Sequence, residues 1–82
     1  MRKKTNNYDH TEKYTEIGYN IAYYRKHANL TQEQLAELVG ISRAHMSAIE
    51  APNVNRSISM ELVFDIAEVL HVDAYKLIKI RD

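Results

Sequence analysis

The run Leu30-Thr31-Gln32-Glu33-Gln34-Leu35-Ala36-Glu37-Leu38-Val39-Gly40-Ile41-Ser42 decides how this chain folds. Thr31 followed by Gln34 is a capping-box pattern, which marks the start of a helix because each side chain bonds the other residue's backbone amide. Gly40 suits the left-handed position that ends a helix, and Ser42 is a favoured cap for the next one. The run therefore predicts two helices joined by a very short turn.

The turn Gly40-Ile41-Ser42 is too short to let the two helices lie antiparallel, so they are expected to meet at a steep angle. In the second of these helices, predicted over 43–50, Met46 and Ile49 face inward. The opposite side then carries small, uncharged residues with longer side chains at its flanks: Ala44, Ser47 and Ala48, flanked by Arg43 and His45. Short side chains where a helix touches the groove floor, with a donor at its N-terminal edge, suit a helix that enters the DNA major groove.

The rest of the chain predicts three more helices and no strand. Two Gly and one Pro are too few turn residues for an antiparallel sheet. One helix is expected to begin near Asp9, which forms a capping-box pattern with Glu12, and to stop at Asn29. Another follows Ser59 to about Leu70, and a last one follows Asp73 to about Ile80. The prediction is an all-α fold with a flexible basic arm over 1–8 and a single domain over 9–80.

Composition excludes several classes of protein. A chain of 82 residues holds one small domain. Because it has no Cys, it has no disulfide and no thiolate metal site. No apolar run is long enough to span a membrane, no two of the four His are spaced for a helical metal pair, and no catalytic motif is present. We therefore expect a cytoplasmic protein that is not an enzyme and has no metal and no cofactor.

The charges balance over the whole chain, with eleven basic and eleven acidic residues. Net charge thus gives no sign of a polyanionic partner, and a nucleic-acid-binding chain of this kind has to gather its basic groups on one face. The basic residues Arg2, Lys3 and Lys4 of the arm are open to two interpretations, a frayed terminus or an arm that lies on DNA.

Residues 17–50, which contain Ile17-Gly18, Arg25-Lys26, the run quoted above and Ile49-Glu50, resemble the phage-repressor helix-turn-helix family, of xenobiotic-response-element or lambda-repressor-like type. Residues 59–77, with Ile66-Ala67-Glu68-Val69-Leu70, are similar to the fourth and fifth helices of that family. The resemblance implies a compact five-helix domain, with the helix-turn-helix at about 31–50 and a third helix that reads DNA.

Carried over by position, the resemblance implies that Arg43, Ala44 and Ser47 face base edges, with Ala48 beside them. It implies that Gln32 contacts a phosphate or the Arg43 side chain, and that Arg25 and Glu50 form an ion pair between helix one and the end of helix three. The full predicted DNA-contacting set is Gln32, Ser42, Arg43, Ala44, His45, Ser47, Ala48, Asn53, Asn55 and Arg56. The chain departs from the family where Ala51-Pro52 replaces the usual Gly, in a longer loop before helix four, and in the alanines of helix three.

The sequence therefore predicts a regulator of transcription that binds specific double-stranded DNA, a repressor that reads the major groove with helix 43–50. The helix before Leu70 is apolar over more than one face. This excess has two interpretations: the flanking helices and the 51–58 loop cover it, or it contacts another chain in a homodimer through that helix and the C-terminal helix. No small-molecule ligand is expected. The alternative is a protein-interaction module on the same fold, such as the partner-binding part of an antitoxin or an anti-repressor. Zero net charge favours this alternative, because phosphate neutralisation supplies most non-specific DNA affinity.

Overall fold

The computed structural model describes residues 8–52 and 57–80, which form five helices. These are α1 (Thr11–His27), α2 (Gln32–Val39), α3 (Arg43–Glu50), α4 (Met60–Leu70) and α5 (Ala74–Ile78). The described residues contain no strand, so the all-α prediction is confirmed. No helix in this part of the chain is long and apolar enough to cross a membrane. Of the predicted arm over 1–8, only Tyr8 lies among the described residues.

The two helices of the turn begin and end where the sequence predicts. Thr31 Oγ1 accepts from the Gln34 backbone N–H at 3.0 Å, and Gln34 Oε1 accepts from the Thr31 N–H at 2.8 Å, which completes the capping box. Gly40 is left-handed with φ 79°. Ser42 Oγ then accepts from the His45 N–H at 3.0 Å. Local hydrogen bonds thus fix both ends of the turn.

The start of α1 differs from the prediction. Asp9 forms no capping box with Glu12; instead its Oδ1 accepts from the Thr11 hydroxyl at 2.6 Å and from the Thr11 backbone N–H at 2.9 Å. This contact two residues ahead is an Asx-type turn, which competes with capping. The helix therefore begins at Thr11, after His10. The hydrogen bond from the Thr11 hydroxyl, and to a smaller extent the one from the Thr11 backbone N–H, lower the pKa of Asp9 from its ordinary value of 3.8.

The last helix also differs, because it ends at Ile78 rather than at Ile80. Asn20, which is buried on α1, donates from Nδ2 to the backbone oxygens of Leu77 at 3.0 Å and Lys79 at 2.9 Å. These bonds satisfy carbonyls that a helix end leaves without a partner inside the helix. Asp73 precedes α5 as predicted but makes no side-chain cap hydrogen bond.

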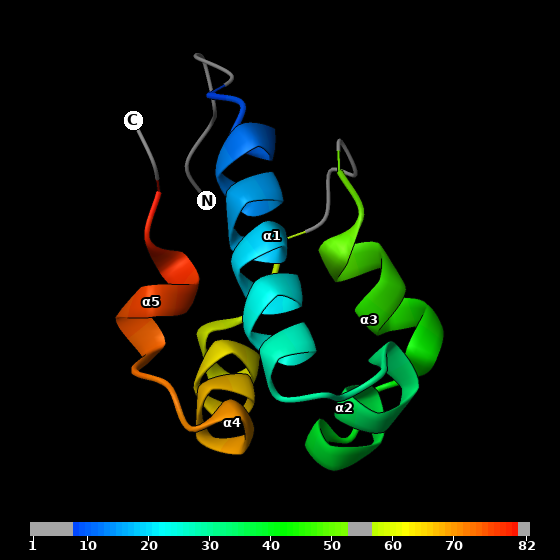
Figure 1. Cartoon of the computed structure of the whole chain (residues 1–82). Helices are drawn as coiled ribbons and strands as arrows, with labels where there is room; N and C mark the ends of the chain where they lie inside the picture. The colour runs from blue at the N-terminus through cyan, green and yellow to red at the C-terminus, as the bar shows by residue number, and fades with distance from the viewer. Residues whose placement is uncertain (1–7, 53–56, 81–82) are drawn as a thin grey trace.

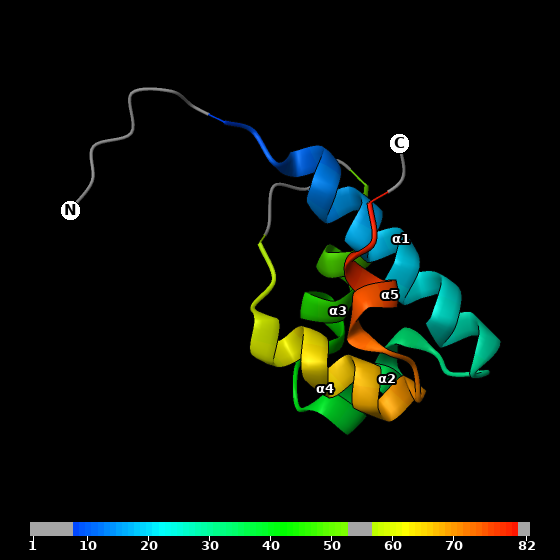
Figure 2. The same ribbon diagram turned by 90° about the vertical axis from the view of Figure 1, so that its left-hand side faces the viewer.

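Every helix contributes a large, fully buried side chain to the core, and α4 contributes two: Ile21, Leu35, Met46, Val63, Ile66 and Leu77. In Figure 1, α1 runs through the middle of the molecule, with α3 on one side of it and α5 on the other. The turned view in Figure 2 shows α5 lying along α1, with α4 below them. The single core thus joins the helix-turn-helix to α1, α4 and α5.

Neighbouring helices cover most of the apolar surface of α4. Leu62, Val63, Ile66, Ala67 and Leu70 are buried and Val69 is half-buried. Only Met60 and Phe64 remain as exposed large apolar residues of this helix, at 48% and 50% exposure. The apolar excess predicted for α4 is therefore mostly core, and its free part is this pair, one helical turn apart.

Candidate nucleic-acid interface

The outer side of α3 is a surface of small residues. Ala44 and Ser47 are exposed and Ala48 is half-buried, whereas Met46 and Ile49 are buried. The predicted inward and outward sides of this helix therefore agree with the structure. Figure 1 shows α3 at the edge of the molecule, beside α2 and far from α5. Because its side chains are short, this face can approach another surface closely.

The N-terminal end of α3 carries its longer side chains. Arg43 is exposed and is the first residue of the helix, and His45 is half-buried on the flank. The Ser42 side chain is already occupied as the cap of this helix. The first N–H groups of a helix point outward without intrahelical partners, and the helix dipole adds partial positive charge there. Arg43 therefore stands where an anion is attracted.

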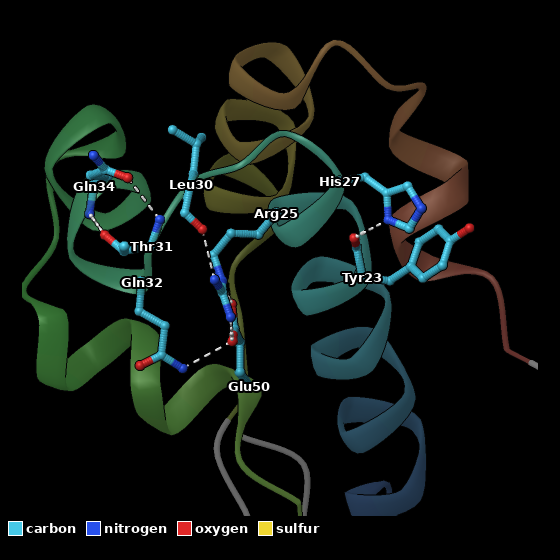
Figure 3. Close-up of polar contacts among 8 residues, drawn as sticks. All are labelled: Tyr23, Arg25, His27, Leu30, Thr31, Gln32, Gln34 and Glu50. Atoms are coloured by element: carbon cyan, nitrogen blue, oxygen red, sulfur yellow. Dashed lines mark hydrogen bonds and ion pairs between the residues drawn. The ribbon is translucent and has the colours of Figure 1, made fainter.

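Gln32 makes a contact that the sequence did not predict. Its Nε2 donates to Glu50 Oε1 at 2.9 Å, so the side chain joins the start of α2 to the end of α3 (Figure 3). The amide nitrogen carries two hydrogens, so this bond leaves one for a second acceptor. Its predicted contact with a phosphate stays a prediction.

Arg25 and Glu50 meet in a buried bidentate ion pair (Figure 3). Arg25 Nε donates to Glu50 Oε2 at 2.7 Å, and Nη2 donates to Oε1 at 2.9 Å. The third nitrogen, Nη1, donates to the Leu30 carbonyl at 2.8 Å. The two side chains are 10% and 5% exposed. Because charge-assisted fork contacts are directional, this pair sets the position of the end of α3 against α1.

Gly18 is a structural residue of the interface that the sequence reasoning missed. A Cβ added there would overlap the Ile49 carbonyl oxygen and lie 3.2 Å from Glu50 Cα. The backbone of α3 thus rests directly on α1 at this point. The available signal was a glycine inside an otherwise regular helix, which indicates close approach of another backbone.

Three residues of the predicted DNA-contacting set, Asn53, Asn55 and Arg56, lie outside the described residues. Arg43 is the only Lys or Arg within the described part of α2 and α3, whereas Glu33 and Glu37 are exposed on α2. The described ranges also contain no group of His, Asp and Glu that could hold a metal ion. The described interface is therefore a small-residue helix face with one cation at its end.

The comparisons with known proteins agree with this geometry. The helix-turn-helix family matches residues 21–77, which include α2, α3 and α4. The chain belongs to this family. Its members of phage-repressor-like type are DNA-binding transcription regulators rather than enzymes. A search of curated proteins gives no significant match.

Solved structures of similar fold include several regulators. The restriction-modification controller protein C.AhdI from Aeromonas hydrophila has a TM-score of 0.75 and 26% identity, over 85% of this chain and 99% of that one. A hypothetical transcription factor, NHTF from Neisseria, has a TM-score of 0.74 and 26% identity, over 95% of this chain and 87% of that one. SinR, a master regulator for biofilm formation solved in complex with DNA, has a TM-score of 0.70 and 30% identity, over 77% of this chain and 98% of that one.

Proposed function

We propose that this protein is a sequence-specific repressor of transcription that places α3 in the major groove of double-stranded DNA. The observation that carries the proposal is the exposed small-residue face of α3, with Arg43 at its N-terminal end. An α-helix fits the major groove, and short side chains let it settle on the groove floor. SinR, which shares this fold at 30% identity, was solved with DNA. Because its target is DNA, we place the protein in the cytoplasm.

Within this proposal the described residues take different roles. Arg43 reads a guanine through its two-pronged guanidinium, the commonest specific contact in the major groove. Ala44, Ser47 and Ala48 lie at the groove floor, with His45 at its edge. Gln32 and Ser42 stand at the N-termini of α2 and α3, where backbone N–H groups and the helix dipole attract phosphate. Asn53, Asn55 and Arg56 remain predicted phosphate contacts. No cofactor and no small-molecule ligand are needed.

The test begins with selection of bound sequences from random duplexes, followed by binding of variants to the selected operator. Arg43→Ala is expected to weaken binding about 5- to 150-fold, the range of a bidentate Arg–guanine pair of about 1–3 kcal/mol, and to relax the preference at one base pair per half-site. Lys26→Ala, which removes an exposed cation from α1 instead, is the matched control. Equal loss of affinity for every single-base variant of the operator would contradict base reading by Arg43.

We also propose a homodimer built on α4 and the C-terminal helix α5. Met60 and Phe64 are exposed on one side of α4, and α5 packs against this helix. A two-fold dimer that binds one side of the duplex presents its third helices about 34 Å apart. The selected operator should then contain two half-sites one helical turn apart. Phe64→Glu is expected to abolish cooperative filling of these half-sites, whereas Asp65→Lys beside it is not; a single unrepeated half-site at saturating protein would refute the dimer.

One observation favours the second candidate, a protein-interaction module. Arg43 is the sole Lys or Arg of the described part of α2 and α3, whereas α2 carries the exposed acidic residues Glu33 and Glu37. Phosphate neutralisation makes non-specific DNA binding fall steeply with salt. The salt dependence of binding to random duplex DNA separates the two candidates. A steep slope supports the repressor, and no binding at low salt supports the interaction module.

A further inference from the structure

A groove lies between α1 and the C-terminal helix and is lined by residues of both; α5 lies on the opposite side of α1 from α3 (Figure 1). The groove consists of a larger cavity of about 640 Å³ and a smaller one of about 310 Å³. Ile80 lines both cavities. Neither the helix-turn-helix nor the proposed DNA contacts use any of these lining residues.

The larger cavity has aromatic walls. Tyr23 and Tyr24 from α1 and Tyr75 from α5 line it. The rings of Tyr23 and Tyr24 meet edge to face with centroids 4.9 Å apart, and the Tyr23 ring lies against His27 at 4.2 Å. Tyr23 and Tyr75 are nonetheless 52% and 59% exposed. The Tyr23 and Tyr24 rings are therefore held against their neighbours, while the exposed surfaces of Tyr23 and Tyr75 remain available for contact.

The groove also gathers much of the positive charge of the described residues. Lys76 and Lys79 line the larger cavity, and Lys13 with His10 lines the smaller one. No Asp or Glu is among the residues that line either cavity. In a chain whose charges cancel overall, this concentration of lysines favours an anionic occupant.

Asn20 supplies a hydrogen-bond acceptor at the edge of the larger cavity. It is 7% exposed, and its Nδ2 is engaged with the Leu77 and Lys79 carbonyls. Among the described residues, none donates to its Oδ1. Because Asn20 lines the cavity, this oxygen can accept an N–H group from an occupant.

We propose that this groove binds an acidic segment of a partner protein, in which aromatic or aliphatic side chains alternate with carboxylates. The carboxylates pair with the lysines, the apolar side chains pack on the tyrosine rings, and Asn20 holds a backbone N–H. Along α1 the groove extends from His10 to Tyr24, about 21 Å at the helical rise of about 1.5 Å per residue. An extended peptide of about six residues covers that length. The lysines at both ends suit such a segment better than a small anion.

The position of the groove allows this segment and DNA to bind together. In Figure 1 α5 and α3 lie on opposite sides of α1, so an occupant of the groove does not cover the outer face of α3. The partner is therefore a regulator that is recruited to, or acts on, the protein while it is on its operator.

In the experiment, the isotopically labelled chain is titrated with a random copolymer of glutamate and tyrosine. Binding is monitored through the backbone amide chemical shifts of the protein. We expect saturable shifts at Tyr23, Tyr75, Lys76 and Ile80, and none on the outer face of α3. A copolymer of lysine and tyrosine, and free glutamate with free tyrosine at the same residue concentration, should cause no such shifts. Prior addition of operator duplex should leave the shifts in place.

Two variants test the chemistry of the groove. Lys76→Glu combined with Lys79→Glu is expected to weaken copolymer binding at least tenfold, whereas Lys26→Glu, an exposed lysine outside the groove, changes it less than twofold. Tyr75→Ala is expected to weaken binding severalfold without loss of fold, because the ring is largely exposed. The proposal would be overturned by chemical shift changes centred on α3, or by a loss of copolymer binding in Lys26→Glu as large as in the double lysine variant. Wild-type affinity in Tyr75→Ala, or binding of the free amino acids as tight as that of the copolymer, would also overturn it.

Discussion

The α2–α3 unit and the pair α1 and α5 are stabilised in different ways. In α2–α3, each helix start is fixed by residues three positions apart in the chain: Thr31 with Gln34, and Ser42 with His45. In α1 and α5, the side-chain hydrogen bonds of Asn20 join residues 57 and 59 positions apart. The shape of the DNA-facing unit is therefore encoded locally, whereas its position on the rest of the molecule depends on contacts between distant residues.

Glu50 is the point where the two kinds of structure meet. It is the last residue of α3, and its carboxylate accepts from Arg25 on α1 and from Gln32 on α2. A buried carboxylate with three charge-assisted or amide donors is well satisfied. Removing it affects the position of α3 without touching the turn that defines α2–α3.

The largest expected effect is the loss of this carboxylate. Glu50→Ala strands the buried Arg25 charge, and breaking a buried pair from one side typically costs about 3–5 kcal/mol. We expect this loss in the free energy of unfolding, measured by chemical denaturation. Gln32→Ala removes only a peripheral hydrogen bond and should cost about 1 kcal/mol.

A double replacement separates pairing from packing. Arg25→Met combined with Glu50→Met removes both charges and keeps side-chain volume, so its free energy of unfolding should exceed that of either single Ala variant. If Glu50→Ala alone unfolds at the same denaturant concentration as the wild type, the pair does not fix α3, and α3 is positioned by its apolar contacts alone.

The second expected effect concerns the contact between α1 and α3. Gly18→Ala places a Cβ on the Ile49 carbonyl, and overpacking of this kind costs about 1–3 kcal/mol. Because both neighbours are backbone, we expect the upper end of that range in chemical denaturation, together with weaker operator binding as α3 shifts.

Gly40→Ala is the matched control for Gly18→Ala. Gly40 has φ 79° and no atom within 4 Å of an added Cβ, so its cost is the left-handed conformation alone, about 1 kcal/mol. A cost for Gly18→Ala no greater than that of Gly40→Ala would show that the helices separate easily.

The comparison also explains which features the sequence could predict. The capping box of Thr31, the left-handed Gly40 and the Ser42 cap were predicted because each signal lies within a few residues of its effect. The bounds of α2 and α3 followed from them. The family resemblance added the meeting of Arg25 with Glu50, which no local pattern indicates.

Features that depend on distant partners were missed or misjudged. Asn20 looks like any polar residue of a helix until α5 lies against it, and Gly18 looks like a weak point until α3 lies on it. The family resemblance implies that Gln32 contacts phosphate or Arg43, which stays a prediction, whereas nothing in its neighbourhood pointed to its further contact with Glu50. The cover over α4 likewise depends on how the other helices pack. No periodicity or spacing within a single sequence identifies these distant partners.

The smallest expected effect lies at the start of α1, where no side chain caps the helix by a hydrogen bond. The pKa of Asp9 is lowered by its hydrogen bonds with Thr11, so the folded state favours the ionised form. This contribution is fully present above the ordinary pKa of 3.8 and is lost as the pH falls through the lower pKa of the folded state. Asp9→Ala should therefore lower the melting temperature slightly at neutral pH, and the difference from wild type should shrink in strong acid. Thr11→Val removes the hydroxyl that is the larger cause of the lowered Asp9 pKa. In the Asp9→Ala background no carboxylate is left at this position, so Thr11→Val should have no pH-dependent effect on the melting temperature there. A difference that stays constant from neutral pH to strong acid would mean that Asp9 acts through the turn's geometry and not through its charge.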